Sequence, residues 1–253
     1  MVVILSKIHD LKVCLSMQVT EVTDSFDLDK VIPFFQPIMD LKNNSVCSYE
    51  CLARLLTFDQ NSYLPTEFLF LVDRQQSVAQ LTQAVLSRSA NYFRNINMAW
   101  NINLSLSDMT DPDTLDFLHS QLTDYPNPKR ISLEITAQNA LMESAKFIQF
   151  SKICHALGIN IVIDNFDQQG CDLQALLGLP IAGVKVSASL FDKVTGDAAT
   201  ADFINELISA AASNKIMVIA ERIERQQTLE IVQQLGIKYA QGFYFSQPKA
   251  KVD

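Results

Sequence analysis

Histidine is scarce in this sequence. The three histidines are His9, His119 and His155, and none lies at the end of a predicted strand. Histidine is the side chain that most readily exchanges a proton near neutral pH, and it is the usual nitrogen ligand of zinc. Its absence from the strand ends argues against histidine-based acid–base catalysis and against a zinc site. Oxygen-bearing side chains remain as the candidate ligands and catalysts.

Cysteine is present but not in a pattern that would form a disulfide framework. The five cysteines form an odd number, and no two have the CxxC spacing: Cys14, Cys47, Cys51, Cys154 and Cys171. Such usage is typical of a protein from a reducing compartment. The sequence therefore predicts a fold that does not depend on disulfides.

No apolar run approaches the roughly 20 residues that a helix needs to cross a bilayer. The opening 17 residues are partly apolar, but Lys7, Asp10 and Lys12 interrupt them, and no convincing signal-peptide cleavage site follows. We expect no membrane segment and a cytoplasmic location. Residues 1–30 are interpreted as an N-terminal extension, or as a linker from a longer regulatory protein, ahead of a domain at 31–253.

A basic stripe is also missing. The sequence has 20 lysines and arginines against 28 aspartates and glutamates, and its net charge of −8 is spread over both halves. Duplex nucleic acid is therefore a poor candidate partner. An acidic pocket can still hold an anionic substrate if metal ions lie between them. At 253 residues and 48% hydrophobic, the chain is long enough to bury the core of one domain.

Six apolar segments end in a polar or charged residue. The central one runs from Ile159 to Ile163 and stops at Asp164 and Asn165, after the helix-ending Gly158. The others carry Asn103 in 99–105, Glu134 in 131–136, Lys185 in 181–187, Glu221 in 215–223 and Gln241 in 239–245. Helical patterns separate them, so the order predicts a (β/α)8-type barrel with these side chains at one mouth.

The start of this barrel is predicted to be irregular. Apolar segments at 33–41 and 46–55 are separated by a turn signal, Asn43-Asn44-Ser45. Such a short connection favours an antiparallel pair. The fold class is thus α/β, a TIM-like (β/α)8 barrel with an antiparallel first strand. Helices are expected from Pro65 and at about 77–93, 111–122, 140–157, 199–213 and 226–235.

Eight short motifs resemble, in order, those of the EAL domain family, bacterial phosphodiesterases that linearise cyclic di-GMP. The resemblance covers about residues 31–248, and each motif falls at a predicted strand. They are Phe35-Gln36-Pro37-Ile38, Glu50-Cys51-Leu52-Ala53-Arg54 (for EAL-x-R), Asn103-Leu104-Ser105, Leu133-Glu134-Ile135-Thr136, Asp164-Asn165-Phe166 (for DDF), Lys185-Val186-Ser187 (for KID), Ala220-Glu221-Arg222-Ile223-Glu224 (for AEGVE) and Gln241-Gly242-Phe243-Tyr244-Phe245.

The resemblance implies hydrolysis at two Mg²⁺ or Mn²⁺ ions, which prefer oxygen ligands. It implies metal ligands at Glu50, Asn103, Glu134, Asp164 and Glu221. It implies catalytic roles for Lys185, Glu221, Gln241 and the altered Asn165, and substrate contacts from Gln36, Arg54 and Glu50. Pairing of two copies into a homodimer is also implied.

The departures from the family pattern point to a degenerate member. Asn165 replaces the second aspartate of DDF, so the oxygen remains while the charge is lost, and a metal site should weaken. Ser187 replaces the aspartate of KID, and Ala137 replaces the last glutamate of LEITE. The family's glycine-rich loop reads Asp167-Gln168-Gln169-Gly170-Cys171-Asp172. Arg222 replaces a glycine, and it either points away as a surface residue or lies across the pocket as a partial substitute for a metal's charge.

Three functions stay open. The first is a catalytically weak or inactive EAL domain that acts as a cyclic di-GMP receptor or as a regulator through a protein partner. The second is an active metal-dependent phosphodiesterase. The third is a protein-binding scaffold that binds no nucleotide, because a fold alone does not fix a function. The retained polar residues at the strand ends favour the first over the third.

Overall fold

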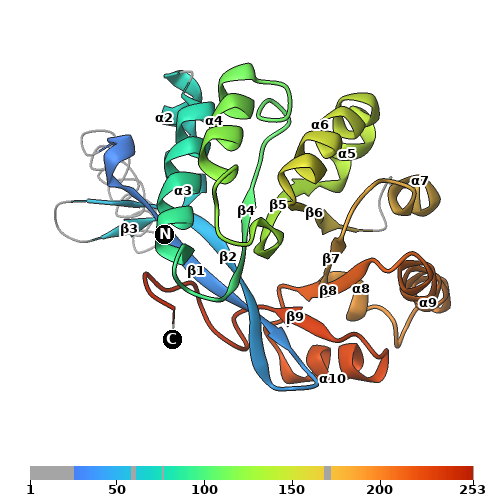
Figure 1. Ribbon diagram of the computed structural model, residues 1–253. Coiled ribbons are helices and arrows are strands. Elements are labelled where there is room, and N and C mark those ends of the chain that lie inside the picture. The colour runs from blue at the N-terminus through green and yellow to red at the C-terminus, as the bar shows by residue number, and fades with distance from the viewer. Residues whose placement is uncertain (1–25, 58–60, 76, 168–171, 253) are drawn as a thin grey trace, which may run out of the picture.

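Eight strands close into a barrel in the computed structural model, which describes residues 26–57, 61–75, 77–167 and 172–252 (Figure 1). Closure occurs because β1 pairs with both β9 and β2, the two ends of the row of parallel strands. The strands of the barrel are β1 (Val31–Asp40), β2 (Ser45–Leu56), β4 (Ala99–Asn103), β5 (Ile131–Thr136), β6 (Asn160–Phe166), β7 (Gly183–Ser187), β8 (Met217–Glu221) and β9 (Tyr239–Gln241). The two-residue β3 (Ser62–Tyr63) extends the sheet beside β2.

The first strand runs against its neighbours, as the sequence predicts. β1 is antiparallel to β2 and to β9, whereas β2 and β4 to β9 are parallel to one another. The connection from β1 to β2 is a tight turn in which Asp40 accepts hydrogen bonds from the backbone N–H groups of Lys42 and Asn43. Asn44 completes the turn with a φ of 47°, a left-handed conformation that asparagine tolerates.

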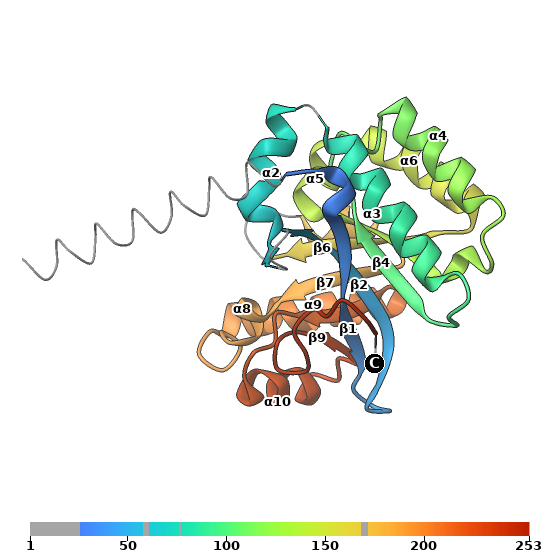
Figure 2. The ribbon, with the colours of Figure 1, turned by 90° about the vertical axis from the view of Figure 1, so that its left-hand side faces the viewer.

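Helices cover the outside of the barrel. Figure 2 shows α3, α4 and α6 on one side of the strands and α8, α9 and α10 on the other. The helices are α2 (Pro65–Arg74), α3 (Val78–Phe93), α4 (Pro112–Leu122), α5 (Ala137–Met142), α6 (Ser144–Leu157), α7 (Leu173–Leu177), α8 (Ala188–Phe191), α9 (Ala198–Ser213) and α10 (Gln226–Gln234), with 3-10 turns at Leu28–Lys30 and Pro128–Arg130.

The single helix expected at 140–157 is wrong, because the chain forms two helices there. Glu143 has φ −120° and ψ 43°, outside the helical region, and separates α5 from α6. α5 begins earlier than expected, at Ala137, since the Thr136 side chain accepts a hydrogen bond from the N–H of Asn139 and caps it. The short α7 and α8, which periodicity did not indicate, are capped in the same way by Asp172 and Ser187.

The face of α6 against the barrel follows the predicted periodicity. Phe147, Phe150 and Cys154 are each at most 1% exposed, three or four residues apart. Gly158 ends the helix with a φ of 74°, a conformation that glycine adopts without a steric penalty. The helix therefore delivers the chain directly into β6.

The barrel interior has an apolar floor beneath a polar layer. Ile38, Val162 and Ile219 form a buried cluster of their own, separate from the large core between strands and helices. Side chains two residues apart along a strand face the same side. Asp164 therefore lies above Val162, and Glu221 above Ile219, toward the carboxyl ends of the strands. This alternation places polar side chains at one mouth of the barrel.

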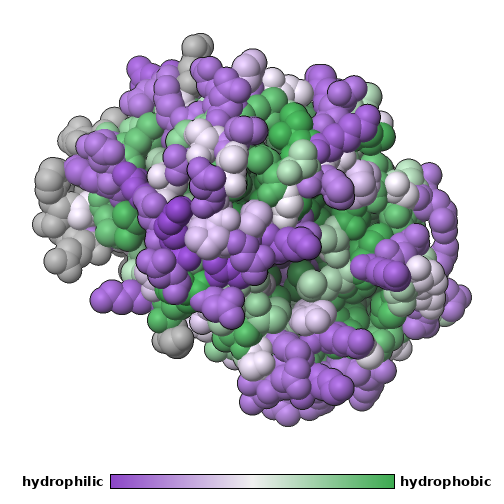
Figure 3. Space-filling view, in the orientation of Figure 1, coloured by the Kyte–Doolittle hydropathy of each residue, from purple (hydrophilic) through white to green (hydrophobic). Residues whose placement is uncertain are grey.

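The surface over α10 is hydrophilic, as the bottom of Figure 3 shows. The exposed residues of this helix are Gln226, Gln227, Glu230, Gln233 and Gln234, while Leu229 and Val232 face the core. Among the described helices, none combines the length and the apolar composition that crossing a membrane requires.

Candidate active site

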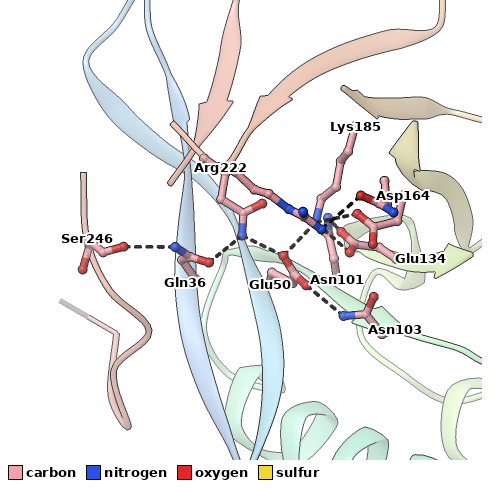
Figure 4. A network of polar contacts seen from close by, with 11 residues as sticks. Gln36, Glu50, Asn101, Asn103, Glu134, Asp164, Lys185, Arg222 and Ser246 are labelled. Atoms are coloured by element: carbon pink, nitrogen blue, oxygen red, sulfur yellow. Dashed lines mark hydrogen bonds and ion pairs between the residues drawn. The ribbon is translucent and has the colours of Figure 1, made fainter. Parts of the chain in front are cut away.

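A single lysine lies at the centre of the polar layer. Lys185, on β7, is fully buried, and its Nζ atom is 2.7 Å from Glu50 Oε2, 2.7 Å from Glu134 Oε2 and 3.7 Å from Asp164 Oδ1 (Figure 4). The three carboxylates come from β2, β5 and β6. One ammonium group is thus surrounded by more negative charge than it can neutralise.

Amide side chains donate hydrogen bonds to the second oxygen of Glu50 and of Glu134, the one that does not contact Lys185. Asn103 Nδ2 donates to Glu50 Oε1 at 2.8 Å, and Asn101 Nδ2 donates to Glu134 Oε1 at 2.7 Å. Both asparagines belong to β4. Because they are two residues apart, they point to the same side of the strand. Asn101 was not predicted as a site residue, although its position two residues before Asn103 on the same strand could have indicated it.

A chain of glutamines extends the network across the β9–β1–β2 side of the mouth. Gln241 Nε2 lies 2.7 Å from Glu50 Oε2 and 3.1 Å from Gln36 Oε1. Gln36 in turn donates to the carbonyl oxygen of Ser246 at 3.1 Å. The network explains why Gln36 and Gln241 are buried although they are polar, since each finds hydrogen-bond partners.

Burial and mutual repulsion shift the pKa values of these carboxyl groups. Burial, reinforced by the nearby Glu50, raises the pKa of Glu134 to about 8. Burial, reinforced by Asp164, raises the pKa of Glu221 to about 7. Burial alone would lower the pKa of Lys185, but Glu134, Glu50 and Asp164 outweigh it and hold that pKa well above its usual value. Lys185 therefore stays charged. Burial would raise the pKa of Glu50, but its ion pair with Lys185 outweighs burial and lowers that pKa, so the raised pKa values belong to Glu134 and Glu221.

Replacing Glu221 by glutamine should stabilise the metal-free protein at pH 8. Its folded-state pKa is raised to about 7 from 4.5, so the cost of ionising it is absent below about pH 4.5 and complete above about pH 7. Glu221→Gln removes that cost, and we expect a gain on the order of 2 kcal/mol at pH 8 that disappears at pH 4.5. Chemical denaturation in chelator at the two pH values measures this gain.

The control is Glu224→Gln, an exposed residue on the same cavity wall, which should change stability by less than about 0.5 kcal/mol at either pH. An equal stability of Glu221→Gln and wild type at pH 8 would contradict the repulsion.

A cavity of about 340 Å³ opens above this network. Its described lining residues include four carboxylates and one cation, Arg222. They are Gln36, Glu50, Leu52, Asp164, Glu221, Arg222, Glu224, Gln241, Gly242 and Phe243. Among the described residues, the buried Glu221 Oε1 and Gln241 Oε1 atoms find no hydrogen-bond partner. An acidic cavity with unpartnered carboxylate and amide oxygens fits the donor preferences of one hard divalent cation.

The donor set is poorer for a second cation. In the described part of the chain, no three histidine, cysteine, aspartate or glutamate side chains are already grouped around a metal position, for the first cation or for the second. At position 165, where the resemblance implies a second carboxylate, Asn165 Oδ1 accepts a hydrogen bond of 3.0 Å from Arg222 Nη2. Arg222 is exposed, but its side chain lines the cavity instead of pointing away from it. A guanidinium stands beside the neutral amide.

Several predicted residues lie apart from this network. Arg54 Nη1 donates to the carbonyl oxygen of Ala53, and its guanidinium lies 5.8 Å from the centre of the Phe34 ring, so these contacts occupy it although the charge of Glu50 also acts on it. Ser187 accepts a hydrogen bond from the N–H of Ser189 as the cap of α8. Ala137 is buried as the first residue of α5. Of the altered loop, residues 168–171 lie outside the described residues.

Gly242 holds the backbone beside Gln241, and its replacement by alanine should strongly destabilise the protein. A Cβ atom there would lie 2.1 Å from the carbonyl oxygen of Ile223 and 2.3 Å from its nitrogen, so the backbone must move. We expect a loss of about 3 kcal/mol or more, which lowers Tm by about 6–12 °C in a domain of this size. Gly196→Ala is the matched control, because nothing lies within 4 Å of the added Cβ. Similar melting temperatures for the two variants would show that the backbone relaxes without cost.

Relatives among curated proteins match most of the chain. The probable cyclic di-GMP phosphodiesterase PdeG of Escherichia coli (strain K12) is 24% identical over 231 residues, which cover 88% of this chain and 46% of that protein. The bifunctional diguanylate cyclase/cyclic di-GMP phosphodiesterase MucR of Pseudomonas aeruginosa is 22% identical over 232 residues, covering 87% of this chain and 33% of MucR. The chain thus spans less than half the length of these relatives.

Solved structures share the fold. The EAL domain of FimX from Pseudomonas aeruginosa, bound to c-di-GMP, superposes with a TM-score of 0.80 at 21% identity, over 94% of this chain and 98% of that one. An EAL domain protein from Listeria monocytogenes EGD-e superposes with a TM-score of 0.81 at 22% identity, over 91% and 93% of the two chains. The family model of the EAL domain matches residues 19–248. The chain therefore belongs to the EAL domain family, a family of cyclic di-GMP signalling.

Proposed function

We propose that this protein is a degenerate EAL domain that binds cyclic di-GMP, hydrolyses it slowly or not at all, and acts as a receptor that signals to a protein partner. The likeness to PdeG and to the c-di-GMP-bound FimX domain supports the choice of ligand. The low identity and the partial coverage of the curated relatives leave hydrolysis to be argued from the site itself.

The observation that carries the proposal is the contact between Arg222 and Asn165. In a two-metal site, a carboxylate at position 165 would carry negative charge to the second ion. Here the side chain is a neutral amide, and its Oδ1 atom accepts a hydrogen bond from Arg222 instead. A positive guanidinium at that place disfavours a second divalent cation. Without that ion, both the attacking water and the leaving oxygen lose stabilisation.

The remaining residues can hold one Mg²⁺ or Mn²⁺ ion. We assign Glu50, Asn103, Glu134, Asp164 and Glu221 as its ligands or close neighbours, because they converge on one mouth. A bound ion would polarise a phosphoryl oxygen and acidify a water molecule. Lys185 holds Glu50 and Glu134 together by its two short ion pairs, and Gln241 orients Glu50 by donating to Oε2. Arg54 would contact a phosphate only after its guanidinium leaves the Ala53 carbonyl.

Titration calorimetry with cyclic di-GMP in Ca²⁺, followed by addition of Mn²⁺ and a search for the linear dinucleotide, tests the proposal. We expect binding without appreciable product. Rapid product formation would show that the amide at position 165 is tolerated and that the protein is a phosphodiesterase. No binding in either metal would overturn the receptor role and place the function on a protein surface.

The second candidate is an active phosphodiesterase, and one observation favours it. Glu50, Glu134 and Asp164 lie within 4 Å of a common Lys185, so most of the implied residues are already assembled. The scaffold that binds no nucleotide is the third candidate. The homodimer is a part of the proposal that light scattering of the purified chain, with and without cyclic di-GMP, can address.

A further inference from the structure

The cavity above Lys185 is acidic, so a ligand anion needs a positive group, either from the protein or from a bound cation, to meet it. Four of its described lining residues are carboxylates: Glu50, Asp164, Glu221 and Glu224. Lys185 lies fully buried beneath and is already paired with Glu50 and Glu134. Among the described residues that line the cavity, Arg222 alone carries positive charge. A ligand phosphate entering this cavity therefore has Arg222 as its protein counter-charge.

The backbone aims Arg222 at position 165 at some conformational cost. Arg222 and Asn165 have φ values of 59° and 53°, in the left-handed region that side chains other than glycine and asparagine adopt reluctantly. The neighbouring residue is fixed, because Ile223 donates its N–H to Gln241 O and accepts from the N–H of Tyr244. Strain of this kind persists where the surrounding structure enforces it, and it gathers at functional sites.

Compared with the family motifs, asparagine in place of aspartate at position 165 and arginine in place of glycine at position 222 compensate each other in charge. A carboxylate at position 165 with a divalent cation, and a glycine at 222, carry a local charge of +1. Asparagine at 165 with arginine at 222 also carries +1. We propose that the Arg222 guanidinium replaces the second divalent cation and binds a phosphate of the cyclic dinucleotide. The proposal rests on the receptor function above and names how that same site recognises its ligand.

The partner of Arg222 leaves it free for this task. Asn165 is neutral, so this hydrogen bond does not cancel the guanidinium charge, although that charge also acts on the neighbouring Glu221. A guanidinium has five N–H donors in a planar fork, of which the contact with Asn165 uses one, and the fork matches two phosphate oxygens. Arg222 is also exposed, so a ligand can reach it. A carboxylate partner would instead have formed an ion pair that competes with the ligand.

Two titrations on the whole chain test the proposal. The first adds CaCl₂ alone and counts the ions bound per chain; we expect one for wild type and two for Asn165→Asp/Arg222→Gly. The second adds cyclic di-GMP in chelator and in Ca²⁺. Arg222→Gly should weaken binding by about 10- to 100-fold in both, since a charge-assisted hydrogen bond is lost. Arg222→Lys should recover part of the affinity because it restores the charge without the fork.

The controls separate this proposal from the receptor function. Glycine suits the positive φ at position 222, so Arg222→Gly should fold normally. Arg225→Gln removes an exposed arginine that pairs with Asp192 outside the cavity lining and should leave the affinity unchanged. Unchanged or tighter binding by Arg222→Gly, or two Ca²⁺ ions per wild-type chain, overturns the proposal alone. Absence of binding by wild type overturns the receptor function and the phosphate contact together.

Discussion

The double variant Asn165→Asp/Arg222→Gly is expected to hydrolyse cyclic di-GMP about 10²-fold faster than wild type in Mn²⁺, because it restores both a charged ligand and the space for a second cation. Asn165→Asp alone should gain less than about 10-fold. Arg222 Nη2 already lies 3.0 Å from Asn165 Oδ1, so a new carboxylate there would form an ion pair with the guanidinium before it could bind a metal. Formation of the linear dinucleotide, followed by chromatography, measures the rates.

The design of this experiment separates the two changes. Synergy, a double variant faster than the product of the single effects, indicates that Arg222 masks position 165. Adding Glu50→Gln to the double variant should remove the gained activity, which shows that the gain arises at this site. If Asn165→Asp alone restores full activity, Arg222 is no obstacle. If neither variant gains activity, the defect lies in Ser187 or in the altered loop at 167–172.

The second large effect concerns stability. Lys185→Met should lower the free energy of unfolding at pH 8 by about 3–5 kcal/mol, because breaking a buried ion pair leaves uncompensated charge. Its Nζ atom is within 2.7 Å of both Glu50 and Glu134, and all three groups are at most 8% exposed. In a domain of this size the loss corresponds to a fall in Tm of about 6–20 °C. Thermal melting of the metal-free protein checks it.

The pH dependence of that loss identifies its cause. Without the lysine, the pKa of Glu134, already about 8, should rise further, so the Glu134 carboxyl of the variant stays protonated at pH 5. Protonated carboxyls need no counter-charge, and the deficit should shrink between pH 8 and pH 5. Lys146→Met, at an exposed lysine that pairs with Glu143, should cost less than about 0.5 kcal/mol at either pH. A deficit for Lys185→Met that is equal at both pH values would point to lost packing instead of charge.

Much of the fold follows from local sequence. Several features have a cause that a short window of sequence contains. They are the polar residues that follow Ile163, the end of α6 at Gly158, the turn at Asn43–Asn44 and the apolar spacing of α6. The alternation of strands and helices and the antiparallel β1 were predicted for that reason, and the structure confirms them. The break at Glu143 was missed because a single non-helical residue decides it. The short helices α7 and α8 were missed because side-chain caps start them and periodicity over so few residues is weak.

The sequence by itself determined which side chains are available at the barrel mouth, because period-two alternation and strand ends depend on neighbours in the chain. Only the tertiary structure decided how they pair. It placed Lys185 between carboxylates that are 51 and 135 residues away, and it brought Arg222 to Asn165 across 57 residues. Both arrangements depend on barrel closure and on the left-handed backbone at positions 165 and 222. Electrostatic contacts of this kind act through space, and no spacing along the chain encodes them.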